Sequence, residues 1–242
     1  MLFFMAGKIF MRILSRMMLW AGLLLWLAGL FSQPLPGVQA SPQMESTPEV
    51  NCRNYRVYLP LIANAPVNPP GGQASTCLSS EEEKLGNLIN AYRSEKGLPP
   101  VPFSQSLTRV AQAHVRDLYE NRPNTGDCNL HSWSDKGSWT PVCYTPDHQN
   151  ASGMWLKPKE ITNGIYTDYG YEIAYCHSAQ ATAEGAFNAW KSSSGHNAVI
   201  IEDDIWKGMK WGAMGIGIYQ NYAVVWFGQA KDPLGSVSAC PR

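Results

Sequence analysis

Apolar residues recur at helical spacing shortly after residue 78. Four of them follow the i, i+3, i+4, i+7 pattern of an amphipathic helix, namely Leu85, Leu88, Ile89 and Tyr92. Ser79 or Ser80 is the expected N-cap, and Glu82 or Glu83 three residues later completes a capping box. Gly97 and the two prolines after it predict the end of this helix.

Two further helices are predicted from the same kind of pattern. The second is capped by Ser104 or Ser106 and ends at the Arg-Pro pair 122–123. Its apolar stripe is Leu107, Val110, Ala111, His114, Val115 and Leu118. The third runs from about Ala179 to Lys191. It is expected to bury Ala183, Ala186, Phe187 and Trp190.

The remaining pattern predicts strands and a long loop region. Residues 124–170 show no lasting period and are interpreted as disulfide-tied loops with short strands. Residues 171–175 are either a strand edge or the turn before a helix. Two apolar runs, 211–219 and 222–229, are separated by Gln220-Asn221 and predict a hairpin. Helices followed by a hairpin indicate an α+β fold with an antiparallel sheet.

The N-terminus has the composition of a secretory signal peptide. Three basic residues precede the uncharged run 17–31, two prolines follow it, and the Val-Gln-Ala sequence at 38–40 predicts cleavage after Ala40. An uncleaved anchor is the alternative, although 15 helical residues reach about 22 Å, less than the roughly 30 Å of a hydrocarbon core. We therefore expect a secreted chain without an integral membrane span.

Proline and glycine divide the rest of the chain. Residues 41–77 contain six prolines and a Gly-Gly pair, which is typical of an extended linker. The apolar stretch 55–62 within it is interpreted as an edge strand or a docking segment. The predicted domain spans 78–232, and residues 233–242 form a C-terminal tail with Cys240.

Charge excludes one class of partner. The chain has 19 basic and 19 acidic residues, and loss of the signal peptide would leave a net charge of about −3. Nucleic acid is therefore not an expected partner, because its binding depends on a strong positive field.

All six cysteines lie beyond the predicted cleavage site, and an even number in an exported chain predicts disulfides. They are Cys52, Cys77, Cys128, Cys143, Cys176 and Cys240. Cys128 and Cys143 flank one loop and are the favoured pair. Cys240 is expected to hold the tail to the domain or to the linker. Sequence alone does not choose among the 15 connectivities.

Two of the five histidines are candidates for a site. His131 and His196 each follow a predicted helix on a loop, where functional residues concentrate. Glu172 is an acid among apolar neighbours, so it must be paired or near solvent. His114 is interpreted as a packed core residue, because it lies on an apolar stripe. Two histidines and a carboxylate are suitable ligands for zinc.

The order of several motifs resembles the CAP superfamily of cysteine-rich secretory, antigen 5 and pathogenesis-related 1 proteins. "HS" follows the second helix, and "GYEIA" occupies 170–174. "FNAWKSSSGHNAVI" and "WGAMGIGIYQNYAVVWFG" then follow at 187–200 and 211–228. The resemblance covers roughly residues 78–232 and implies an α-β-α sandwich with a central antiparallel sheet.

The resemblance also implies a cleft lined by two histidines and two acids. His131, Glu172 and His196 match three of these positions, whereas Ser192 or Ser193 occupies the position of the second glutamate. Hydrolysis that depends on that glutamate is therefore not expected. The insertion 133–169 separates His131 from Glu172 and is expected to cover or reshape the cleft.

These features predict a secreted, non-catalytic binding module. The resemblance implies that its ligand would be hydrophobic, such as a sterol or fatty acid, or an extracellular protein or cell-wall component. No cofactor is required, but the imidazoles of His131 and His196 could bind Zn²⁺ weakly beside Glu172. Two alternatives remain: a metal-dependent hydrolase using the same cleft, and a carbohydrate-binding module built on the tryptophans of the insertion, Trp133, Trp139 and Trp155.

Overall fold

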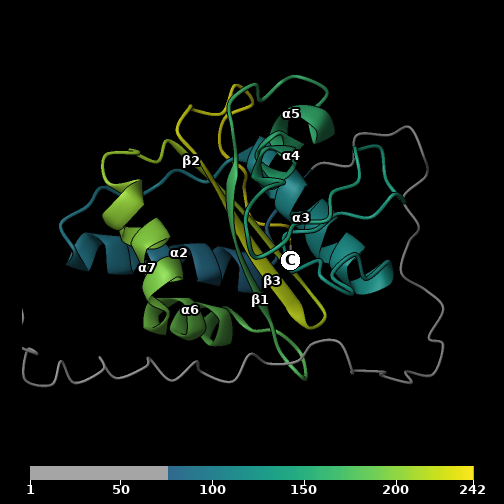
Figure 1. Cartoon of the computed structure of the whole chain (residues 1–242). Helices are drawn as coiled ribbons and strands as arrows, with labels where there is room; N and C mark the ends of the chain where they lie inside the picture. The colour runs from purple at the N-terminus through teal and green to yellow at the C-terminus, as the bar shows by residue number, and fades with distance from the viewer. Residues whose placement is uncertain (1–75, 242) are drawn as a thin grey trace, which may run out of the picture. The chain divides into compact units, whose positions relative to one another are not determined.

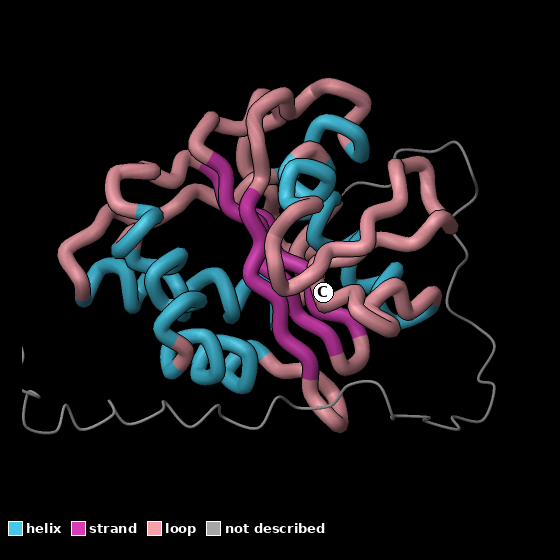
Figure 2. The backbone as a smooth tube through the Cα atoms, viewed as in Figure 1, coloured by secondary structure: helices cyan, strands magenta, loops and turns pink. Residues whose placement is uncertain are grey.

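Three antiparallel strands form the middle of three layers (Figures 1 and 2). The computed structural model describes residues 76–241. The strands are β1 (Tyr171–Cys176), β2 (Ala213–Tyr219) and β3 (Tyr222–Gly228), in the order β1-β3-β2. Successive side chains of a strand point to opposite faces, so the sheet supplies two separate cores. The predicted α+β sandwich with a central antiparallel sheet is confirmed.

Three helices cover one face of the sheet. They are α2 (Ser80–Glu95), α6 (Ala183–Ser192) and α7 (Ser194–Ile201). Their apolar side chains pack with Ile173 of β1 and Phe227 of β3 in one buried cluster.

The other face is covered by α3 (Gln105–Glu120), the short helices α4 (Ala151–Trp155) and α5 (Lys157–Ile161), and the loops around them. Helix α3 lies very close to β2. A Cβ at Gly215 would collide with the backbone of Leu107, so only glycine allows this approach.

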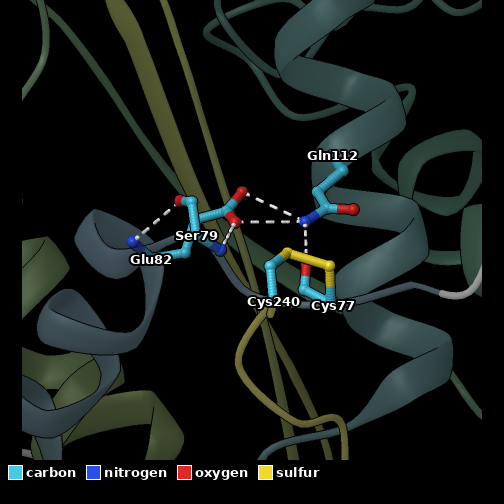
Figure 3. Close-up of a disulfide and its surroundings, with 5 residues drawn as sticks. All are labelled: Cys77, Ser79, Glu82, Gln112 and Cys240. Carbon is cyan, nitrogen blue, oxygen red and sulfur yellow. Dashed lines mark hydrogen bonds between the residues drawn. A yellow bond between two sulfur atoms is a disulfide. The ribbon is translucent and has the colours of Figure 1, made fainter. Parts of the chain in front are cut away.

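The ends of the described domain are joined to its body. Ser79 caps α2, and the Glu82 carboxylate accepts from the Ser79 backbone N–H at 2.8 Å, which confirms the capping box. Glu82 is buried and also accepts from the Gln112 side chain of α3 (Figure 3). The same amide donates to the carbonyl of Cys77, whose disulfide with Cys240 holds the C-terminal tail (Figure 3).

The favoured cysteine pair, Cys128 and Cys143, is confirmed as a disulfide. The tail cysteine, Cys240, forms a disulfide with Cys77, the last residue of the predicted linker. This is one of the two attachments of the tail that the sequence predicted. Cys176 at the end of β1 is disulfide-bonded as well. Cys52 lies outside the described residues.

Three local predictions were wrong. The third helix begins at Ala183 after a Thr182 cap, not near Ala179, because Thr182 accepts from the Gly185 N–H. The segment expected to end it instead begins α7, so His196 lies in a helix rather than in a loop. Helices α4 and α5 occupy part of 124–170, where short strands were expected. In this segment the structure describes one isolated antiparallel bridge, between Trp133 and Val142.

The signal peptide, its cleavage after Ala40, and the linker segment up to residue 75 lie outside the described residues, so these remain predictions. Within residues 76–241, no helix has the length and apolar character needed to cross a membrane.

Candidate functional site

A buried carboxylate on β1 connects two histidines that come from separate parts of the chain. Glu172 Oε2 lies 2.7 Å from Nδ1 of His131, which is in the loop after α3. Glu172 Oε1 lies 2.5 Å from Nδ1 of His114, which is on α3 itself. The structure thus brings His131 and Glu172 together and adds His114, which the sequence had placed in the core.

The contacts of His114 determine where a proton must lie. Its Nε2 is 2.9 Å from the carbonyl oxygen of Ser132, which can only accept, so Nε2 carries a hydrogen. A neutral imidazole has one N–H, so the short Nδ1–Oε1 contact requires a further proton between His114 and Glu172. These two groups therefore form either an ion pair or a neutral pair with the proton on the carboxyl group.

Aromatic rings seal this pair from water. The His114 ring is fully buried and stacks on Trp133 at 4.1 Å between centroids, with Trp226 at its edge. Burial by itself raises the pKa of Glu172, but the charges and hydrogen bonds of His114 and His131 outweigh it and lower this pKa below its ordinary value. Glu172 is therefore ionised near neutral pH.

His131 is oriented by this carboxylate. Since its Nδ1 faces Glu172, a neutral ring would hold its hydrogen there and leave a lone pair on Nε2. Its ring packs at 5.2 Å from Tyr144, which comes from the insertion 133–169. Tyr144 is fixed in turn by backbone bonds to Asn129 and to the Ser132 hydroxyl, next to the Cys128–Cys143 disulfide. The insertion therefore contacts the site through Tyr144.

His196 and Ser193 form the other part of the site. Ser193 is the N-cap of α7, and its hydroxyl lies 2.8 Å from Nδ1 of His196. The pKa of His196 falls to about 4, first because the ring is removed from water and second because the charge of His131 opposes another positive charge. His196 is thus neutral near pH 7, and the charge of His131 is close enough to act on it. We call His131, Glu172, Ser193 and His196 the histidine site.

A zinc ion does not find three protein ligands here. Both oxygens of Glu172 are engaged by imidazoles, and the described residues hold no group of three or more His, Cys, Asp or Glu side chains able to bind a metal. The Nε2 atoms of His131 and His196 are the ligands that remain, and two ligands support weak binding only.

Sequence reasoning missed His114 and Tyr144. The helical period of α3 predicts that position 114 is buried, whichever residue occupies it. The one sequence signal for His114 was that a buried polar side chain needs a hydrogen-bond partner. Tyr144 had no signal, because its contact depends on how the insertion folds back. The surface expected from Trp133, Trp139 and Trp155 is wrong for Trp133, which is 2% exposed.

Comparisons with known proteins give one family match and several similar solved structures. The family model "CAP: Cysteine-rich secretory protein family" matches residues 87–225. Among solved structures, an extracellular protein with an SCP domain from Bacillus anthracis is similar at 18% identity and a TM-score of 0.42, over 62% of this chain and 40% of that one. A cysteine-rich secretory protein from Staphylococcus aureus is similar at 16% identity and a TM-score of 0.40, over 62% and 39%.

An outer surface protein from Borrelia burgdorferi is similar at 19% identity and a TM-score of 0.41, over 63% of this chain and 95% of that one. The matched part of this chain thus spans about two fifths of the first two proteins. No curated protein matches the chain significantly.

Proposed function

Because the chain belongs to the cysteine-rich secretory protein (CAP) family, we propose that it is an extracellular, non-catalytic binding module that holds its ligand at the histidine site. Two disulfides among the described residues, together with the bonded Cys176, suit an oxidising compartment outside the cell.

The proposal rests on the hydrogen bonds of Glu172, whose two carboxylate oxygens both contact imidazole rings. A carboxylate that acts as general base must reach water or substrate with a free oxygen. Here Oε1 faces His114, Oε2 faces His131, and the carboxyl group is fully shielded from solvent. Glu172 therefore orients His131 and has no free oxygen for a proton transfer to a bound molecule.

The serine and histidine of the site do not form an activated nucleophile. Ser193 and His196 are within hydrogen-bond distance, as a hydrolase would require. However, the pKa of His196 is about 4, because burial comes first and the charge of His131 second, and such a base takes up a serine proton poorly near pH 7. Among the described residues no carboxylate is bonded to His196 to support it. The pair is better explained as a local contact between the N-cap residue of α7 and a side chain in the first turn of that helix.

The ligand is expected to be an apolar molecule with one polar group, such as a fatty acid or a sterol. A neutral imidazole offers one N–H donor and one lone pair, so the two Nε2 atoms could serve a carboxylate or a hydroxyl. An extracellular protein partner remains the other candidate.

One observation favours the hydrolase alternative. The contact between Glu172 and His131 orients an imidazole whose Nε2 is free, which is also how a general base for water attack is held. Turnover separates the two functions. We expect no hydrolysis of ester and peptide panels by the wild type, whereas hydrolysis that disappears in Glu172→Gln contradicts the proposal.

Binding is tested by NMR of the histidine rings during titration with palmitate and cholesterol. We expect one of these ligands to shift the ring signals of His131 and His196, while His177 at the far end of β1 is the internal control. Unchanged signals for both site histidines at saturating ligand would refute this ligand class.

A further inference from the structure

A strip of aromatic side chains crosses the surface beside the beginning of β1. It consists of Tyr169, Trp155, Tyr171 and Trp206, and we call it the aromatic strip. These side chains come from three segments: the end of α4, the residues leading into β1, and the 3₁₀ turn Asp204–Trp206 after α7. In Figure 1 helices α4 and α5 lie to one side of the upper end of β1, and α7 lies to the other.

The rings touch one another in an unbroken series. Centroids are 6.0 Å apart for Tyr169 and Trp155, 5.9 Å for Trp155 and Tyr171, and 5.3 Å for Tyr171 and Trp206. Neighbouring ring planes are inclined by 47°, 53° and 77°, so the four rings do not lie in one plane.

The strip is held firmly from below. Trp206 and Tyr171 both pack on Trp211, which is 5% exposed and contacts Phe227 in the core. The backbone N–H of Gly170 donates to the carbonyl of Trp155 at 3.0 Å and joins two of the segments. A surface fixed in this way loses little conformational entropy when a ligand binds.

The strip also keeps its polar atoms available. Tyr169 is 48% exposed, and the other three side chains are partly exposed. Their indole N–H and phenol O–H groups make no hydrogen bond to another described residue. Each ring therefore presents an apolar face together with a hydrogen-bonding group at its rim.

We propose that the aromatic strip binds a neutral, β-1,4-linked polysaccharide chain. A pyranose ring has apolar C–H faces and a rim of hydroxyl groups, which complements a ring face with a polar rim. The steps of 5.3 to 6.0 Å between the rings are close to the length of one sugar unit in such a chain. Rings that do not share a plane suit a single chain better than a flat crystalline face.

Charge favours a neutral chain over an anionic membrane. A lipid-binding surface combines apolar residues with an excess of lysine and arginine. The turn that carries Trp206 has Lys207 and Lys210, but Asp203 and Asp204 balance them, and all four are exposed. Ile205 is 79% exposed at this edge, so insertion into lipid is the competing explanation that the experiment must separate.

The test is calorimetric titration of the full chain with cellotetraose and chitotetraose. We expect one of these to bind, and we expect Tyr169→Ala and Trp206→Ala each to weaken binding at least about tenfold, since one stacked ring contributes on the order of 1.4 kcal/mol. Tyr119→Ala is the matched control, because Tyr119 is a partly exposed aromatic residue of α3 away from the strip. Its ring packs against Tyr219 at the end of β2. This variant is expected to bind like the wild type.

Two outcomes would overturn the proposal. One is that neither oligosaccharide binds, or that all variants bind equally. The other is binding to phosphatidylcholine–phosphatidylglycerol vesicles that Ile205→Ser abolishes, without oligosaccharide binding, which would assign the strip to a membrane surface. Tyr169 is nearly half exposed, so its variant is expected to fold even if Trp206→Ala does not. The strip is separate from the histidine site, and its test does not depend on the function proposed there.

Discussion

His196 is predicted to make the folded protein less stable as the pH falls. Burial first, and the charge of His131 second, lower its pKa from 6.5 to about 4 in the folded chain. Between these two values the unfolded chain binds a proton that the folded chain does not. The stabilisation by neutral His196 is therefore complete above about pH 6.5 and is lost as the pH falls towards about 4.

The size of the effect follows from the difference of about two and a half pKa units. At 1.36 kcal/mol per unit, this corresponds to about 3 kcal/mol as an upper limit. The His196 side chain is only partly shielded from solvent, so we expect about 2–3 kcal/mol. Such a loss is a large share of the 5–15 kcal/mol that typically stabilises a domain.

The perturbation is His196→Gln, which keeps a polar side chain but cannot be charged. Urea unfolding of both proteins at about pH 7 and about pH 4 gives the free energies of unfolding. We expect the wild type to lose about 2–3 kcal/mol more than the variant over this interval. Carboxylates such as Glu172 titrate in both proteins, so their contribution largely cancels in the comparison. Equal losses, or an NMR titration that places His196 near 6.5, would show that the ring is not desolvated as described.

Three further predictions concern packing, covalent constraint and metal binding. Gly215→Ala should destabilise the fold by about 1–3 kcal/mol or prevent folding, because its Cβ collides with the backbone of α3. Thermal unfolding measures this, with Gly195→Ala as the control, because a Cβ at Gly195 meets no other atom. Equal melting temperatures of the two variants would contradict the prediction. Replacing Cys128 and Cys143 together by serine should cost about 3 kcal/mol in urea unfolding, since the closed loop spans 15 positions; an unchanged midpoint would refute it. Zinc calorimetry should show weak uptake by the wild type that alanine at either histidine of the site removes, and equal uptake by all three proteins would exclude a shared site.

Much of the local structure was predictable because its causes are local in the sequence. The capping box of Ser79 and Glu82 joins residues three positions apart, and the α2 and α3 stripes reflect the period of a helix. The β2–β3 hairpin needs only two residues in its turn. The Cys128–Cys143 disulfide also closes a short loop.

The pattern was weakest where no apolar stripe follows one face of a segment. Helix α7 has the sequence SGHNAVII, which lacks the polar face that marks an amphipathic helix, and its end at Glu202 requires a left-handed backbone. Helices α4 and α5 are single short turns within a loop region, stabilised by packing rather than by a repeating stripe.

The sequence determined α2, α3, most of α6 and the β2–β3 hairpin. It also determined the Cys128–Cys143 pair and singled out His131, Glu172 and His196 as candidates. Only the tertiary structure decided that His114, 58 positions before Glu172, shares a proton with that carboxylate. It also decided that Tyr144 packs on His131, and that Tyr171 lies in a series of exposed rings. Contacts of this kind depend on which strand edge and which helix face meet after folding. Residue type and periodicity record that a polar group needs a partner, but not which distant group supplies it.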